Sequence, residues 1–310
     1  MAAPGAHVAD GRYIVRFGRA DRIQHVVLLV SFLGLAATGL PLLFSDALWA
    51  GPLARLFGGF VAAGILHRIF ATVLIGVFFV HVARIALRMV RGDRGLLWGP
   101  TSLVPQPRDL TDLYGHLRWF LRLGPRPAFG RYTYWEKFDY WAVFWGMLII
   151  GSSGLMLWFP EFFAIFLPGW VFNVALFVHG EEALLAVAFI VTIHFFNSHM
   201  RPHKFPMDMV MFTGVVPEDE YQRERPLEVA RLKAAGALES RLGAPPSPTF
   251  VRRARWGGAV AIAIGLTLFL LILVAAATRG PASSLRGRGS TPTVRPPAGR
   301  PRGRGCCAPP

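Results

Sequence analysis

The sequence has 310 residues, of which 53% are hydrophobic and only 16% charged, below the roughly 25% of an ordinary soluble domain. Its 33 basic and 18 acidic side chains give a formal net charge of +15. Because the apolar residues gather in long runs, the composition excludes a soluble domain and indicates a membrane protein. We therefore expect the partner of this basic chain to be membrane lipid and not nucleic acid.

Five apolar runs are long enough to cross a bilayer, which takes about 20 residues. In chain order they cover residues 25–44, 60–87, 140–159, 171–196 and 256–278. The first run is too long for the apolar part of a secretory signal, and no small-residue cleavage site follows it. The sequence thus predicts an all-α integral membrane protein with a four-helix transmembrane bundle and a fifth, C-terminal transmembrane helix.

Basic residues are concentrated in alternate connections between these spans. Four arginines precede the first span, ten basic residues lie in 84–137, and ten more lie in 201–255. Cytoplasmic loops of membrane proteins carry such an excess of Lys and Arg. We therefore expect a multi-pass protein of the bacterial inner (cytoplasmic) membrane with a cytoplasmic N-terminus.

The charge pattern and the spans divide the chain into five predicted parts. They are a cytoplasmic lead-in (1–24, irregular to about Gly18), a transmembrane domain (25–214), a cytoplasmic segment (215–255), a fifth transmembrane helix (256–278) and a disordered Arg/Gly/Pro-rich tail (279–310). Residues 110–123 have the pattern of an interfacial amphipathic helix, and residues 226–242 that of a short helix. Seven arginines in the tail conflict with an outer C-terminus, so the side of the tail stays open.

Histidines inside the spans are the strongest functional signal. Of nine histidines, five lie within the predicted spans: His25, His67, His81, His179 and His194. Ionisable side chains in hydrocarbon are costly and usually face a functional interior. A single one is often only a hydrogen-bond partner between helices, but five at regular spacing favour a cofactor. The remote His7 and His116 are expected to be solvated.

The spacing of the histidines predicts two metal sites. His67 and His81 are 14 residues apart, and His179 and His194 are 15 apart, or about 21 and 22 Å along a helix axis. The 14-residue spacing brings the second histidine back to within about 40° of the helix face that carries the first, and the 15-residue spacing to within about 60°. Each helix then presents one imidazole near each membrane surface, as in bundles that hold low-spin haem between facing helices.

The direction of the spans sets the pairs of ligands. His67 and His179 lie near the outer surface and would bind the outer haem iron. His194 lies near the inner surface, where either His25 or His81 can be the second ligand of the inner haem iron. Two non-covalent b-type haems are predicted, since no Cys-x-x-Cys-His is present, and the adjacent Cys306 and Cys307 are too few for an iron–sulfur cluster.

Four further residues are candidates for cofactor binding. Arg68 and Arg84 lie beside predicted ligands and could pair with haem propionates, although snorkelling to the interface explains them equally well. His199 and His203 follow the fourth span at the inner surface. They are candidates for a quinone site, against the simpler interpretation of an interfacial turn.

The stretch RFGRADRIQHVVLLVSFLGLAATGLPLLF (16–44) and the LHRIF that opens the second span resemble the membrane cytochrome b subunits of respiratory formate dehydrogenases (gamma subunit) and nickel–iron hydrogenases. The blocks 130–146 and 197–208 resemble a gamma-like branch of this family, and the likeness covers residues 12–214. It implies that His25 and His194 bind the inner haem and His67 and His179 the outer one. The extra His81 and the 15-residue spacing depart from the family pattern.

The resemblance implies a di-haem subunit that transfers electrons between a peripheral redox enzyme and the quinone pool. Its partners would be an iron–sulfur or cytochrome c subunit and a catalytic redox subunit, with quinone as electron-transfer substrate. One alternative is a quinol-oxidising cytochrome b that delivers electrons to a periplasmic c-type cytochrome or reductase. A haem-free transporter with a histidine proton relay is the third possibility, which the absence of inverted repeats disfavours.

The loop charges make a direct prediction about topology. Single cysteines placed in 46–59 or 161–170 of a chain without Cys306 and Cys307 should react with an impermeant reagent in intact cells. Cysteines placed in 88–138 should react only after the membrane is opened. The reverse labelling pattern would contradict the predicted orientation and exchange the inner and outer sites.

Overall fold

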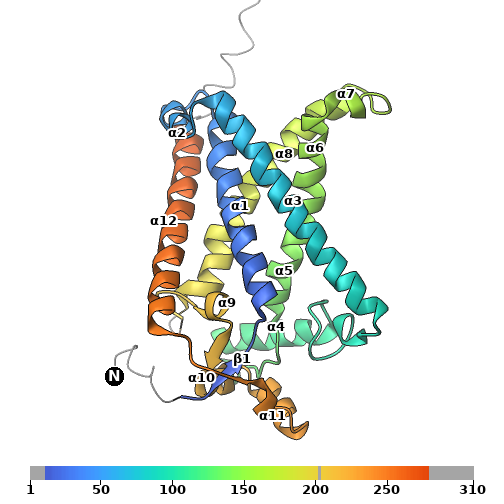
Figure 1. The fold of residues 1–310 in the computed structure, drawn as a ribbon, viewed down its shortest axis with the longest axis vertical. Coiled ribbons are helices and arrows are strands. Elements are labelled where there is room, and N and C mark those ends of the chain that lie inside the picture. Colours follow the sequence, from blue (N-terminus) through green and yellow to red (C-terminus); the bar gives the residue numbers. More distant parts are fainter. Residues whose placement is uncertain (1–10, 202–203, 279–310) are drawn as a thin grey trace, which may run out of the picture.

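The structure is a computed structural model that describes residues 11–201 and 204–278. Its chain is mainly helical, and five of its helices are long and apolar enough to cross a membrane (Figure 1). A small three-stranded sheet lies at one end of the helices, here called the sheet end. The opposite end carries α2 (Ala50–Leu56) and α7 (Pro160–Phe163) and is called the α2 end. The predicted tail, His7 and His203 lie outside the described residues.

All five predicted spans are confirmed as helices. The first is α1 (Arg19–Leu43), the second α3 (Phe60–Val90) and the fifth α12 (Pro248–Thr278). The third joins α5 (Tyr134–Gly146), the π-helical turn η2 (Met147–Gly151) and α6 (Ser152–Trp158); the fourth joins α8 (Trp170–Phe189) and the π-helical turns η3 (Ile190–His194) and η4 (Phe196–Met200). Most extend beyond the apolar runs, because polar turns at their ends are also helical.

The helix start of α5 shows why hydropathy misses such turns. Thr133 caps α5 by accepting a hydrogen bond from the amide of Glu136, and the Glu136 carboxylate accepts one from the Thr133 amide in return. This reciprocal pair satisfies two free amides of the first turn. The third span therefore starts at Tyr134, six residues before the predicted start at 140.

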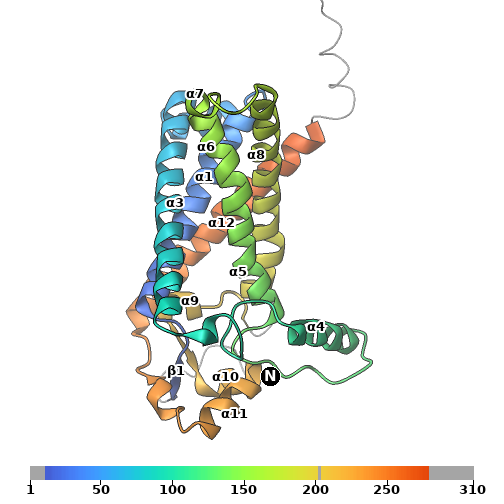
Figure 2. The same ribbon diagram turned by 90° about the vertical axis from the view of Figure 1, so that its right-hand side faces the viewer.

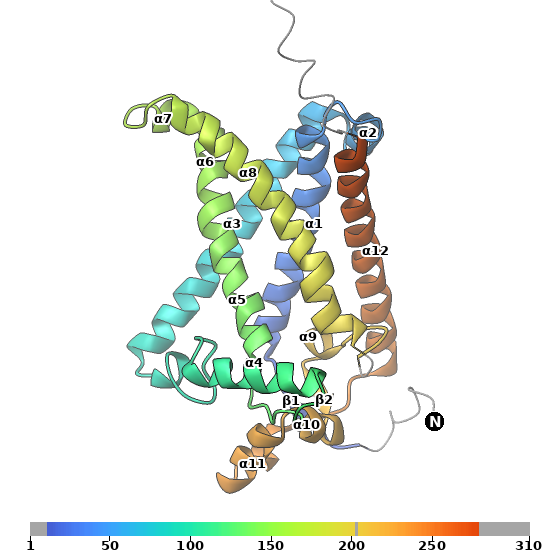
Figure 3. The ribbon, with the colours of Figure 1, turned by 180° about the vertical axis from the view of Figure 1, so that it is seen from behind.

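The hydrophobic core of the bundle lies where α12 covers α1 and α8. Leu40 of α1, Phe44 directly after it, Val187 of α8, Val191 of η3 and Leu268 of α12 are buried together. By contrast, much of the apolar surface of α3 is exposed, which suits a helix that faces lipid. From behind, α12 runs beside α1 from the sheet end to the α2 end (Figure 3).

The sheet end corrects the expectation of an irregular lead-in. Strand β1 (Tyr13–Val15) lies between β2 (Val215–Pro217) and β3 (Leu242–Gly243), and both pairings are antiparallel. Ile14, which is only 1% exposed, packs with Val216. The lead-in and the segment after the fourth span thus form one small folded unit.

Helices α10 (Glu218–Glu224) and α11 (Pro226–Ala234) complete this unit. Their side chains Tyr221, Val229 and Leu232 join its core. The predicted helix 226–242 was too long, because Gly236 takes a φ of +60° after Ala235 and turns the chain away. A short 3-10 turn, η5 (Glu239–Arg241), then leads into β3.

The predicted amphipathic helix is confirmed as α4 (Pro107–Phe120), which follows the 3-10 turn η1 (Arg94–Leu96). In Figure 2 it lies beside the lower ends of the spans and extends crosswise to them. Leu110 and Phe120 are exposed on it. The expectation for His116 was wrong: its ring stacks on Phe120 and bonds to the hydroxyl of Tyr134, which ties α4 to α5.

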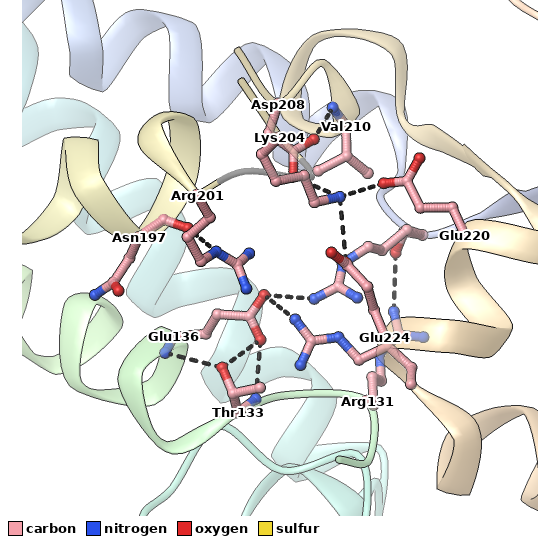
Figure 4. Close-up of polar contacts among 12 residues, drawn as sticks. Arg131, Thr133, Glu136, Asn197, Arg201, Lys204, Asp208, Val210, Glu220 and Glu224 are labelled. Carbon is pink, nitrogen blue, oxygen red and sulfur yellow. Dashed lines mark hydrogen bonds and ion pairs between the residues drawn. The ribbon is translucent and has the colours of Figure 1, made fainter. Parts of the chain in front are cut away.

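A cluster of buried charges joins the sheet unit to the bundle (Figure 4). The carboxylate of Glu136 in α5 accepts hydrogen bonds from Arg16, which follows β1, at 2.7 Å and from Arg225, between α10 and α11, at 3.0 Å. Both guanidinium groups are almost fully buried, at 6% and 3% side-chain exposure. One carboxylate of α5 thus holds two cations of the sheet unit.

Lys204 forms the second centre of the cluster, close to the turn α9 (Val210–Thr213). Its ammonium group contacts the carboxylates of Asp208, Glu220 and Glu224 (Figure 4). Burial opposes the charged form of Lys204, but the three carboxylates outweigh it and raise the pKa of the amine. The link after the fourth span is thereby fixed to α10.

This cluster leads to a stability prediction for Glu136→Gln. The neutral amide would leave Arg16 and Arg225 buried without a counter-charge, a change that typically costs about 3–5 kcal/mol. We expect a clearly lower thermal and denaturant midpoint for the variant in detergent or nanodiscs, measured by circular dichroism.

The matched control is Asp219→Asn, which breaks the bridge between Asp219 and Arg223, both 69% exposed. An exposed pair is worth at most about 1 kcal/mol. Equal losses in the two variants would show that the buried cluster does not hold the sheet unit on the bundle.

Candidate functional site

Two of the predicted ligands meet near the α2 end. His67 of α3 and His179 of α8 face one another with ring centroids 6.3 Å apart and ring planes at 78°. Two imidazoles that bind one metal ion from opposite sides, with bonds of about 2 Å each, hold their centroids about 6 Å apart. The separation therefore suits a shared metal centre between the helices.

The hydrogen bond of His67 fixes which ring nitrogen carries the proton. Its Nδ1 lies 3.2 Å from the hydroxyl oxygen of Thr38 in α1. That hydroxyl donates its own proton to the carbonyl of Gly34, at 2.6 Å, so its oxygen is left to accept. The Nδ1 of His67 is then the donor, and Nε2 keeps a free lone pair for a ligand.

The ring of His179 is held in the same way from the third span. Its Nδ1 lies 3.1 Å from the carbonyl oxygen of Ile150, which can only accept. The hydroxyl of Ser153 lies nearby at 3.3 Å and donates to the carbonyl of Ile149. Ile150 belongs to the π turn η2, where the backbone departs from α-helical bonding. Nε2 of His179 is thus also free to bind a metal.

Two glycines make room for these rings. A Cβ atom on Gly39 of α1 would lie 2.9 Å from Cε1 of His67, and one on Gly154 of α6 would lie 2.9 Å from Cε1 of His179. Real Cβ contacts are essentially never that short, so any side chain at either position would displace the neighbouring ring.

These supporting residues belong to a repeat that the histidine pattern alone misses. Thr38 and Gly39 open the sequence TGLPLLF, and Ser153 and Gly154 open the sequence SGLMLWF. Both match hydroxyl-Gly-Leu-x-Leu-x-Phe, and each copy precedes its histidine by less than 30 residues. The two helix pairs run in the same direction, so the repeat is parallel and not inverted. A search for internal repeats would have found it.

The second group of histidines lies toward the sheet end. His25 of α1 is close enough to His194 and His199 for their charges to interact. Its Nδ1 is buried without a hydrogen-bond partner, and its ring packs edge-on against Phe212 at 6.4 Å. The Nδ1 of His194 lies 3.2 Å from a carboxylate oxygen of Asp139 in α5, which leaves Nε2 of His194 free.

The π turns explain the unusual 15-residue spacing of His179 and His194. A π turn contains one residue more than an α-helical turn. Because η3 ends at His194 and holds this extra residue, the two histidines lie on the helix almost as if 14 residues of regular α-helix separated them. The spacing therefore keeps both rings near one face of the fourth span.

His81 lies apart from these groups. Its Nε2 is 2.9 Å from the hydroxyl of Tyr140, and its ring packs edge-on against Tyr140 and Phe144. The ring nitrogen that would face a metal is thus already hydrogen-bonded. This contact gives His81 a role between α3 and α5 that needs no cofactor.

The two candidate arginines make contacts with protein. Arg84 donates to the carboxylate of Asp21 at 3.0 Å and to the side chain of Gln24 at 3.1 Å, both on α1. Arg68 lies over the ring of Trp158, 5.8 Å from its centroid. A role with an anionic cofactor group would require Arg84 to exchange its carboxylate partner.

His199 has a defined hydrogen-bond state. The amide of Asp208 donates to its Nδ1 at 3.3 Å, so Nδ1 is the acceptor and Nε2 carries the proton. Such an imidazole is a hydrogen-bond donor and not a metal ligand at Nε2. The described residues contain no group of three or more His, Cys, Asp or Glu side chains that could hold a bare metal ion.

No protein-family model matches the sequence. The chain is similar to the protein named formate dehydrogenase, cytochrome b556(fdo) subunit, of Escherichia coli K12, and to the proteins of the same name in strains O6:H1 and O157:H7. In each case the identity is 24% over 185 residues, which cover 59% of this chain and 77% of the relative.

Proposed function

We propose that the chain is a di-haem cytochrome b subunit that transfers electrons across the membrane between a peripheral redox enzyme, formate dehydrogenase-like or similar, and the quinone pool. The single observation that carries this proposal is the opposed pair His67 and His179, with each Nδ1 held by a neighbouring helix and each Nε2 free. The similarity to cytochrome b subunits of formate dehydrogenase supports haem b as the cofactor.

The residues of the outer pair fit a haem better than a bare metal ion. A haem would need only two ligands from the protein, which agrees with two imidazoles and no group of three metal-binding side chains among the described residues. Hydrogen bonds to Nδ1 orient such ligands and raise their basicity. When bound, two haems would supply reversible one-electron iron chemistry at two depths of the bilayer.

For the inner haem we propose His25 and His194 as ligands, with His81 as the less favoured alternative. His25 precedes Thr38 by 13 residues, or about 20 Å along α1, which places it at about the depth of His194. It also lies in electrostatic range of His194, whereas Nε2 of His81 is bonded to Tyr140. Thus the contacts of His81 and the ligand arrangement of the resembling family both favour His25.

We further propose that quinone binds beside His199. A quinone carbonyl accepts hydrogen bonds, and the tautomer of His199 makes Nε2 a donor. The imidazole lies within electrostatic range of both His25 and His194, so a bound quinone would be close to the inner haem. Arg68 and Arg84 remain candidates for propionate contacts.

The proposed orientation places the sheet end in the cytoplasm. The basic loops, α4 and the sheet unit all lie at that end, as the positive-inside rule requires. The catalytic partner and its iron–sulfur or cytochrome c subunit would then meet the α2 end, near His67 and His179. The division into a di-haem domain, a cytoplasmic unit and a fifth helix follows from the same arrangement.

Haem content tests the proposal. Pyridine haemochrome analysis of the purified protein should give two b-type haems per chain, removable by acid acetone because no cysteine binds them covalently. Gly39→Leu should lower this number to one, because the side chain would displace the ring of His67.

The matched control is Gly64→Leu on α3, where a Cβ meets nothing within 4 Å. This variant should keep two haems. A wild-type protein without haem would refute the proposal, and equal haem loss in both variants would remove the evidence that Gly39 makes room for His67.

The inner ligand is tested by His25→Ala and His81→Ala. We expect His25→Ala to remove the inner haem and quinone-linked turnover, while the outer haem survives. His81→Ala should keep both haems and cost about 1–3 kcal/mol of stability, because Tyr140 loses its partner. Haem content, optical spectra and denaturation separate these effects.

His194→Ala serves as the reference, since both assignments include His194. It should lack the inner haem in every case. Loss of the inner haem in His81→Ala together with its retention in His25→Ala would assign the ligand to His81 instead.

A further inference from the structure

The proposed ligands are anchored by chemically different acceptors at the two ends. His67 donates to the hydroxyl oxygen of Thr38, and His179 donates to the carbonyl of Ile150. Both acceptors are neutral. His194 instead donates to the carboxylate of Asp139, at 3.2 Å. The inner ligand alone among these three therefore has an acidic partner.

The carboxylate of Asp139 is directed at His194 and at no other described group. Its side chain is 15% exposed, and its second oxygen, Oδ1, is buried without a hydrogen-bond partner. The nearest lysine along the chain, Lys137, is bound to Asp109 at 2.8 Å and does not pair with Asp139. No arginine or lysine of the described residues forms an ion pair with this carboxylate, so its charge is left for the imidazole.

We propose that Asp139 is a positioning residue for the inner haem, which fixes the ring of His194 and lowers the reduction potential of that haem. This inference rests on the proposed function, because it requires His194 to be a ligand of the inner haem. Hydrogen bonds from an imidazole to a carboxylate are stronger than those to a neutral acceptor. They make the ligand more basic, and a more basic ligand favours oxidised iron.

The same acceptor chemistry distinguishes the two haems. At the outer end, hydrogen bonds to the neutral acceptors Thr38 and Ile150 raise the basicity of the imidazoles less than a hydrogen bond to a carboxylate would. At the inner end, the negative charge of Asp139 adds to the effect of its hydrogen bond, since both stabilise the higher charge of ferric iron. The inner haem is thus a stronger electron donor to a nearby quinone than it would be with a neutral anchor.

The test is a spectroelectrochemical titration of the full chain in nanodiscs. Asp139→Asn keeps an acceptor of similar shape but removes the charge. We expect a tenfold change in the ratio of reduced to oxidised inner haem at fixed potential, which corresponds to a rise of about 59 mV for one electron. The outer haem, identified by its loss in His67→Ala, should keep its potential, and the EPR g values of the inner haem should shift.

The matched control is Tyr140→Phe, which removes the neighbouring hydroxyl that contacts His81 and should leave both potentials unchanged. Asp139→Glu, which retains the charge, should lie close to wild type. Unchanged potentials and g values in Asp139→Asn would overturn the inference while the two haems still support the proposed function. A wild-type chain without an inner haem would instead refute the proposed function itself.

Loss of the inner haem in Asp139→Asn would make Asp139→Glu decisive. Retention of the haem at the wild-type potential in the Glu variant would support the role of the carboxylate. Equal loss of the haem in the Glu variant would assign Asp139 a packing role only and overturn the inference.

Discussion

An imidazole N–H placed among apolar helices must find its acceptor inside the bundle, because lipid offers none. His67 meets this requirement through Thr38 on α1, and His179 meets it through Ile150 on the third span. Each contact demands that two helices approach closely. This close approach explains why positions 39 and 154 are glycine. The carbonyl of Ile150, which accepts from His179, belongs to a π turn.

The spans, and the end of the bundle at which each histidine lies, could be predicted from the sequence because each depends only on the order of residues along the chain. Length and hydropathy locate the five helices, and the direction of the spans brings His67 and His179 to the same end of the bundle. The acceptors could not be predicted in the same way. Thr38 and Ile150 become partners only through helix packing, although the repeated hydroxyl-Gly-Leu motif carried a usable signal.

The sheet end was the least predictable part of the fold. Strand β1 has three residues and pairs with segments about 200 residues away, so no local sequence pattern predicts it. The sheet unit is linked to α5 through Arg16 and Arg225, which look like ordinary topology-setting arginines in the sequence. Only the folded chain shows that both meet Glu136. The positive-inside interpretation describes the surplus charge but not these buried cations.

The first turns of α5 connect the sheet unit to the histidines. Thr133 caps the helix, Glu136 holds the cations of the sheet unit, and Asp139, one turn further, reaches His194. Residues 133–139 therefore fix the ionic cluster and His194 with one rigid element. His67 and His179 lie among apolar helices toward the α2 end, where close packing and backbone carbonyls are the available means of support. His194 lies toward the charged sheet end and is held by a carboxylate, so the position of each histidine along the bundle determines the chemistry that supports its ring.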